Sequence, residues 1–176
     1  MRRAQPGDAA ALVALAEEVA SEPEGWLISA GAWRTPGEER RFLRALRRYS
    51  DAAVFIAEVS EQMGTGLIPS SSTSNRVVGR MSLGRDPHPA SRHVADLGLM
   101  VAASHRRRGI GRALLEQAAD WARDAGIRKL ELHVFPWNEP ALKLYEQFGF
   151  EREGLRKDHY RRGAEYVDAI LMALRL

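Results

Sequence analysis

The chain has 176 residues, of which 45% are hydrophobic and 28% are charged, a composition typical of one folded domain rather than a disordered chain. It contains no cysteine, which excludes a disulfide framework, a thiol nucleophile and a cysteine-ligated metal. The formal net charge is only +3, but arginine is concentrated around residues 40–48, 106–112 and 156–162. This distribution favours local anion sites over a nucleic-acid partner.

No apolar run approaches the roughly 20 residues needed to cross a bilayer. The first residues also lack the apolar core of a signal peptide. We therefore expect a cytoplasmic protein with no membrane partner.

Two amphipathic helices are expected in the first 50 residues. Asp8 suits the N-cap of the first helix, and the Pro-Glu-Gly sequence at 23–25 is expected to end it. Pro36 suits the first turn of the second helix. The apolar side of that second helix is expected to consist of Phe42, Leu43, Leu46 and Tyr49.

Three strands are expected next. Residues 52–59 and 76–83 are expected to pair as a hairpin, and the polar segment 61–75 between them predicts a mobile loop rather than a domain linker. Residues 93–101 predict a buried strand in which Gly98 loosens the hydrogen-bond ladder.

Helices and strands alternate in the second half. A helix is expected to start at Gly109 and stop at Gly126, followed by a strand over 129–135, a helix over 140–148 and a final long strand over 166–176. This order fits an α/β sheet with helices on both faces.

The segment 106–112, Arg-Arg-Arg-Gly-Ile-Gly-Arg, lies between a predicted strand and a predicted helix. Glycine lets a backbone come close to an anion, and the N–H groups of the first helical turn have no intrahelical partners. The helix dipole also favours negative charge there, so the segment predicts a phosphate-binding turn. The alternative is a solvated basic connection without a ligand.

Two common phosphate motifs do not match this turn. A P-loop requires Lys and Ser/Thr after its second glycine, and neither is present. The dinucleotide-binding motif requires a third glycine where this chain has Leu114.

The turn instead resembles the Gln/Arg-x-x-Gly-x-Gly/Ala motif of the GNAT superfamily of acyl-CoA-dependent N-acyltransferases, through Arg106, Gly109 and Gly111. The resemblance continues through Asn138 and the block from Ala141 to Phe150, which contains Tyr145 in the position that the family expects. It is strong from about residue 94 to 154, whereas the N-terminal third matches only in the order of elements.

The resemblance implies a single GNAT-like α/β domain over residues 1–176. Its central sheet would be mixed and mostly antiparallel, with a bulged strand and helices on both faces. It also implies acetyl-CoA as co-substrate and no metal. The residues expected to bind coenzyme A are Leu99, Met100, Val101, Arg106, Arg107, Arg108, Gly109, Ile110, Gly111, Arg112, Asn138 and Tyr145.

The implied reaction is attack by a neutral amine on an acyl thioester through a tetrahedral intermediate. Tyr145 is the expected proton donor to the departing thiolate, because a phenol stays protonated at neutral pH. The alternative for this residue is core packing. Asn138 has two compatible roles, a contact to pantetheine and a helix cap.

The general base is left open between three residues. Glu131 and His133 share one face of their strand, and His133 stands where some protein-acetylating relatives have a glutamate base. Asp96 is a third candidate, acting through water. A base is dispensable if the amine arrives neutral.

The acceptor is expected to be the primary amine of a small molecule, an amino acid or a protein N-terminus. Asp168 is a candidate ammonium ligand, and Arg156, Arg161 and Arg162 are candidates for binding an acidic group, although solvated charge is the default for each. An acceptor pocket would be lined by Trp26, Trp33 and Trp137, unless these residues belong to the core.

Two other functions are left open, a non-catalytic acyl-CoA-binding regulatory module and a basic nucleic-acid module. The presence of Tyr145 where the GNAT motif expects it counts against the non-catalytic module. The position of the arginines in a glycine turn counts against the nucleic-acid module. Edge pairing of the long final strand leaves a homodimer open.

Overall fold

The computed structural model describes residues 1–28, 33–48, 50–62 and 73–176. Its centre is a seven-stranded sheet in the order β1-β2-β3-β4-β5-β7-β6. The strands are β1 (Arg2–Arg3), β2 (Ala52–Gln62), β3 (Thr73–Arg85), β4 (Val94–Val101), β5 (Lys129–Val134), β6 (Glu151–Arg162) and β7 (Glu165–Arg175). The helices are α1 (Ala9–Ala20), α2 (Pro36–Leu46), α3 (Ile110–Asp124) and α4 (Glu139–Phe148).

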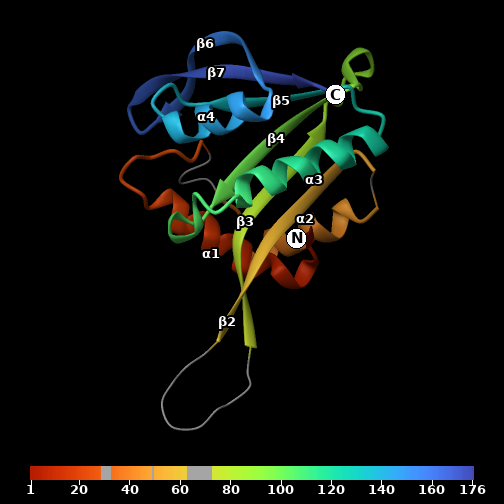
Figure 1. Ribbon diagram of the computed structural model, residues 1–176, viewed down its shortest axis with the longest axis vertical. Helices are drawn as coiled ribbons and strands as arrows, with labels where there is room; N and C mark the ends of the chain where they lie inside the picture. The colour runs from red at the N-terminus through yellow and green to blue at the C-terminus, as the bar shows by residue number, and fades with distance from the viewer. Residues whose placement is uncertain (29–32, 49, 63–72) are drawn as a thin grey trace.

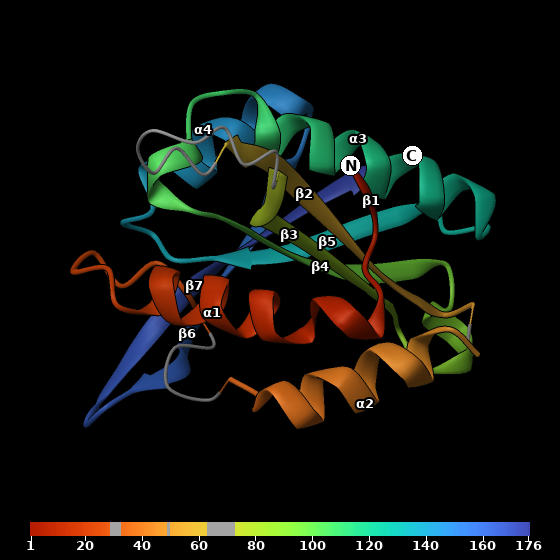
Figure 2. The same ribbon diagram turned by 90° about the horizontal axis from the view of Figure 1, so that it is seen from below.

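The helices form one layer on each face of the sheet. Figure 2 shows α1 and α2 side by side on one face and α3 and α4 on the other. The strand pairs are antiparallel except for β4 and β5, which are parallel. The predicted mixed, mostly antiparallel sheet with helices on both faces is therefore confirmed.

Strands β4 and β5 are paired at only one end. Their pairing runs from Val94↔Lys129 to Asp96↔Glu131, and beyond this point the two strands diverge (Figure 1). The divergence frees the β5-facing edge of β4 from Leu97 onward. A free edge in the middle of a sheet is a place where an extended amide ligand can pair with the backbone.

Gly98 does not interrupt the ladder as expected. The β3–β4 register is continuous from Gly79↔Val101 to Arg85↔Ala95 and passes through Ser82↔Gly98. The register shifts lie elsewhere, between Ala57 and Glu58 in β2–β3 and within β6–β7. The free edge therefore arises from strand divergence and not from a loosened β3–β4 ladder.

Two strands were not predicted. Strand β6 is exposed along nearly its whole length, and β1 has only two residues, so neither shows the alternation of apolar and polar residues by which strands are recognised. The hairpin strands are also longer than expected, because their pairing continues to Gln62↔Thr73. Tyr49 and the part of the predicted loop at 63–72 lie outside the described residues.

Asp8 occupies the predicted N-cap position of α1, but its side chain does not act as a cap. The Asp8 side chain does not bond to that helix; it accepts a hydrogen bond from the Gln5 backbone N–H at 2.7 Å and pairs with Arg2. In α2, Pro36 occupies the first turn as predicted, and Thr35 at the N-cap and Glu38 three residues later form a capping box.

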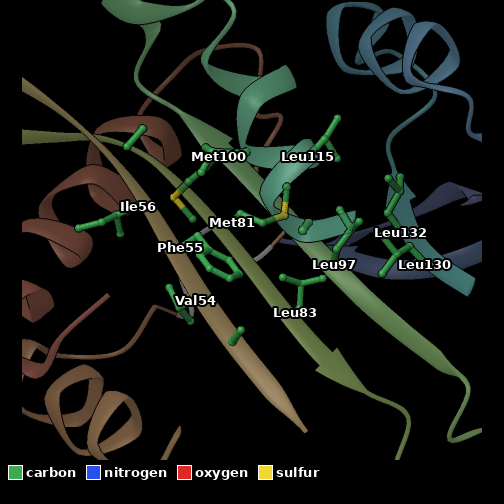
Figure 3. Packing of buried hydrophobic residues seen from close by; sticks show 14 of the residues in the cluster. Val54, Phe55, Ile56, Met81, Leu83, Leu97, Met100, Leu115, Leu130 and Leu132 are labelled. Carbon is green, nitrogen blue, oxygen red and sulfur yellow. The ribbon is translucent and has the colours of Figure 1, made fainter. Parts of the chain in front are cut away.

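The core fills both spaces between the sheet and its helices. Figure 3 shows Phe55, Met81, Leu83 and Leu97 on the sheet beside Leu115 of α3. Two charged residues, Glu39 and Arg80, are also buried on the α1/α2 side. None of the helices in the described ranges is long and apolar enough to span a membrane.

Candidate active site

The turn before α3 has the geometry of an anion-binding turn. Arg107 and Gly109 both have left-handed backbones, with φ of 61° and 79°. Gly109 is the N-cap of α3, and the first helical hydrogen bond runs from the Ala113 N–H to the Gly109 carbonyl. The N–H groups of residues 110–112 are therefore left without helical partners at the start of the helix. The predicted order of strand, glycine turn and helix is confirmed.

Two further glycines let α3 lie close to its neighbours. A Cβ at Gly111 would lie 2.9 Å from Leu144 of α4, so this glycine brings the start of α3 against α4. A Cβ at Gly79 would lie 3.0 Å from Leu114 and 3.1 Å from Ile110, so the bare backbone of β3 seats the same helical turn on the sheet.

A cavity of about 600 Å³ opens between the end of β4, the start of α3 and helix α4. Its walls include every residue that was expected to bind coenzyme A except Arg108. The cavity also has walls that the sequence did not indicate, Val19 of α1 and Leu27 beyond it. Trp26, which was considered for an acceptor pocket, lines this cavity instead. A cavity of this size is typical of a small-molecule site.

The arginines of the turn divide into two kinds. The Arg106 guanidinium donates to the Val101 carbonyl at 3.0 Å, pairs with Glu22 at 2.6 Å and lies over the Trp26 ring, so it holds the turn against its surroundings. Arg107 and Arg108 are exposed and form no hydrogen bond or ion pair with the described part of the chain. Both guanidinium groups are therefore available to phosphates.

Arg112 is intermediate between these two kinds. Its guanidinium forms an exposed ion pair with Glu116 one helical turn away, at 3.2 Å. An exposed pair of this type is weak, so a phosphate can compete for the side chain.

Tyr145 is buried and lines the cavity. Its ring packs at 5.6 Å from Phe150, so it contributes to the core as well. Burial raises the pKa of its phenol above the ordinary value near 10, which keeps the hydroxyl protonated. The hydroxyl has no hydrogen-bond partner among the residues that the structure describes. A protonated phenol in a cavity wall is suited to donating a proton to a ligand.

Asn138 combines the two roles considered for it. Its side chain caps α4 by accepting from the Ala141 N–H at 3.3 Å, and it also lines the cavity. The amide N–H₂ of the same side chain is not used by this cap and is available to a ligand carbonyl.

The three candidate bases lie on the α1/α2 face of the sheet, outside the walls of the cavity. Glu131 forms an ion pair with Lys129 at 2.6 Å. His133 shares a hydrogen bond of 2.7 Å between Nδ1 and the Tyr160 hydroxyl, and its Nε2 is buried without a partner in the described ranges. Burial lowers the pKa of His133, and the nearby cation of Arg156 lowers it further.

Asp96 is the more accessible of the two candidate carboxylates. It is exposed on β4 and lies opposite Glu131 at the last paired position before the strands diverge. Partial desolvation raises the pKa of Asp96, and the charge of Glu131 adds to this effect. A raised pKa makes a carboxylate a stronger base at neutral pH.

The remaining acceptor candidates are mostly engaged within the fold. Asp168 accepts from the Asp158 N–H at 2.9 Å, and Arg161 donates to the Gly163 carbonyl. Arg162 lies near the rings of Phe135 and Trp137, which stack at 4.5 Å, and Arg156 reaches His159. Trp33 lies under Arg80, away from the cavity walls.

No group of three or more metal-ligating side chains occurs in the portion of the chain that the structure describes.

Comparison with known proteins gives one consistent result. Residues 12–150 match the model of the acetyltransferase (GNAT) family. The chain is 40% identical over 101 residues to L-amino acid N-acetyltransferase AaaT of Escherichia coli (strain K12), which covers 55% of this chain and 60% of that protein. It is 38% identical over 76 residues to the [ribosomal protein bS18]-alanine N-acetyltransferase of Salmonella typhimurium (strain LT2), covering 43% of this chain and 51% of the relative. The alignments thus span only about half to three fifths of these relatives.

The fold is similar over a greater length. The crystal structure of a GNAT-family acetyltransferase from Streptococcus pneumoniae superimposes with a TM-score of 0.81 at 28% sequence identity. The match covers 99% of this chain and 98% of that one.

Proposed function

Because the chain belongs to the acetyltransferase (GNAT) family, we propose that it transfers an acetyl group from acetyl-CoA to a primary amine. The observation that carries this proposal is that the glycine turn, the free edge of β4, Asn138 and Tyr145 all line the same cavity. These are the parts that an acyl thioester needs, namely a phosphate site, an amide-pairing edge and a proton donor.

Coenzyme A would be held mainly by backbone groups. Its pyrophosphate would accept from the N–H groups at the start of α3, with Arg107 and Arg108 supplying positive charge. Its pantetheine arm would lie along the free edge of β4 at Leu99–Val101, as an added strand does. The Asn138 amide would bind an amide of the same arm.

The chemistry would be direct transfer. The lone pair of the neutral amine attacks the thioester carbon, and a β4 N–H stabilises the oxyanion of the tetrahedral intermediate. The C–S bond then breaks, the thiolate takes the proton of Tyr145, and the nitrogen loses one proton to base. An acetamide and coenzyme A are the products. The phenolate of Tyr145 recovers its proton from solvent or from the conjugate acid of the base.

Asp96 is the base that the geometry favours. It is exposed and has a raised pKa, whereas Glu131 is paired with Lys129 and His133 is bonded to Tyr160. It would act through a water molecule, because its side chain lies outside the cavity walls. Glu131 and His133 would then shape the acceptor side of the sheet.

The acceptor would be a small-molecule amine, an amino acid or a protein N-terminus. One relative is named as an L-amino acid N-acetyltransferase and another acetylates the alanine of a ribosomal protein, which supports the last two classes.

The test combines calorimetry with product analysis. Titration with coenzyme A measures binding, and mass spectrometry after incubation with acetyl-CoA and a panel of amines, amino acids and peptides detects transfer. We expect binding together with an acetylated product of at least one primary amine. Binding with no product from any acceptor would support the non-catalytic acyl-CoA-binding module instead. Failure to bind coenzyme A would refute the proposed function altogether.

A further inference from the structure

Helix α2 carries a group of arginines that the proposed reaction does not use. Its outer side and its C-terminal end present Arg40, Arg41, Arg44, Arg47 and Arg48, all of them exposed. We call this group the α2 arginine surface. None of the five guanidinium groups forms a hydrogen bond or ion pair with the residues that the structure describes. Glu38, the exposed acid on the same helix, is held by Thr35.

This surface accounts for the positive charge of the chain. The protein has 26 basic and 23 acidic residues, so without these five arginines it would have 21 basic residues against 23 acidic ones. Arginines elsewhere are often paired, for example Arg2 with Asp8, Arg92 with Asp51 and Arg152 with Glu146. Basic residues without an ion pair in the described ranges also occur in the glycine turn, at Arg107 and Arg108, and on β6. The α2 group is the largest, with five arginines between residues 40 and 48, and it lies at the outer edge of the layer across the sheet from α3 (Figure 2).

Three of the arginines surround a hollow. Arg41, Arg44 and Arg48, together with Ala45, line a depression of about 250 Å³. Arg41 and Arg44 are three residues apart on α2, a rise of roughly 4.5 Å along the helix, and Arg48 lies in the turn just after the helix ends. Because the three side chains line one hollow, their guanidinium groups can contact neighbouring anionic groups.

The chemistry of this surface fits a phosphate backbone better than a protein. Protein interfaces have an apolar centre, whereas Ala45 is the one apolar residue that lines this hollow. Five cations within residues 40–48 form a dense positive array, which matches a polymer carrying one negative charge every few ångströms. Helix α2 itself exposes no aromatic ring among its described residues, so the contact would involve phosphates rather than stacked bases.

We propose that the α2 arginine surface binds the phosphate backbone of a nucleic-acid strand without regard to base sequence. The site is separate from the coenzyme A cavity, because α2 lies on the opposite face of the sheet from α3. This site departs from the expectation of no nucleic-acid partner, which was based on the small net charge, on the grouping of the arginines into local clusters and on the position of one cluster in the glycine turn. It does not depend on the proposed acetyl transfer.

The test is fluorescence anisotropy with a short labelled RNA and a DNA strand of the same sequence, measured from about 50 to 200 mM salt. Three to five phosphate contacts predict a slope of log K against log salt between about −2 and −3.5 for single strands. In the variant with Arg41→Gln, Arg44→Gln and Arg48→Gln the slope should be shallower than in wild type by about 2. A matched variant with Arg123→Gln, Arg152→Gln and Arg175→Gln has the same net charge and should bind as wild type does.

Three controls locate the site and identify the partner. Saturating coenzyme A should leave strand binding unchanged, and displacement by coenzyme A would overturn the proposal because the strand would then occupy the glycine turn. Tighter binding of polyglutamate than of either strand would overturn it in favour of an acidic protein. Equal binding by the two triple variants, or no binding at low salt, would show that the surface is only solvated. Equal coenzyme A affinity of the wild type and the α2 variant would show that the variant is folded.

Discussion

Replacing Gly79 by alanine tests how the start of α3 is seated on the sheet. Gly79 lies on β3 beneath the first turn of that helix, and an added Cβ would meet three neighbours at once. The distances would be 3.0 Å to Leu114, 3.1 Å to Ile110 and 3.2 Å to the Cβ of Ala57. The Ala57 Cβ cannot rotate away, and the side chains of Leu114 and Ile110 would have to give by a few tenths of an ångström, so we expect the first turn of α3 to move slightly outward.

The expected cost follows from these contacts. Overpacking of this kind costs about 1 to 3 kcal/mol, and removing a flexible glycine from the unfolded chain returns about 0.4 to 1 kcal/mol. The midpoints of these ranges give a net loss of about 1.3 kcal/mol, which lowers Tm by about 3 to 5 °C in a chain of this size. The KM for acetyl-CoA should rise several-fold, because Ile110 and its N–H belong to the displaced turn.

The measurements are thermal unfolding and initial rates at varied acetyl-CoA. Gly84→Ala on the same strand is the matched control, because nothing lies within 4 Å of its added Cβ. We expect this control to be neutral or slightly stabilising. If Gly79→Ala has the Tm and the KM of wild type, the absence of a Cβ at Gly79 is not what lets α3 lie against the sheet.

Three further predictions concern the charged residues around the site. Arg106→Ala removes the contacts of this guanidinium to Val101 and Glu22. We expect the free energy of unfolding, measured with urea, to fall by about 1.5 to 3 kcal/mol, and coenzyme A binding, measured by calorimetry, to weaken. Wild-type values in both measurements would show that this guanidinium does not hold the turn. The pKa of His133 is lowered in the fold, so below about pH 6.5 the folded protein binds fewer protons than the unfolded chain. The contribution of His133 to stability is therefore complete above this pH and is lost as the pH falls. A plot of Tm against pH should therefore slope less over this range for His133→Gln than for wild type, and parallel plots would contradict the prediction. Because the pKa of Asp96 is raised, kcat/KM should fall at acid pH with an apparent pKa above the ordinary carboxylate value near 4. This fall should be absent in Asp96→Asn. If it survives the substitution, another residue is the base.

Most of the walls of the cavity were predictable as one group because its parts are local. The glycine turn, Asn138 and Tyr145 each belong to a short segment with fixed spacing. The ends of β4, α3 and α4 then bring these segments to one cavity. Arg108 is the exception among the expected residues: it belongs to the same turn but does not line the cavity.

Those features of the site that join distant segments could not be predicted in the same way. The hydrogen bond of His133 to Tyr160 depends on β6, an edge strand without apolar alternation. Trp26 reaches the cavity from the segment that follows α1, about 80 residues before the turn, and lies against Arg106. The free edge of β4 likewise results from divergence from β5, a property of the sheet that no single segment encodes.

The central claim, acetyl transfer with Tyr145 as proton donor, is tested most directly by thiol release from acetyl-CoA with the best acceptor amine, comparing wild type with Tyr145→Phe. The hydroxyl has no partner in the described structure, so the substitution should leave Tm and coenzyme A affinity close to those of wild type. The account predicts that kcat falls by about 10² or more. An unchanged kcat would contradict it.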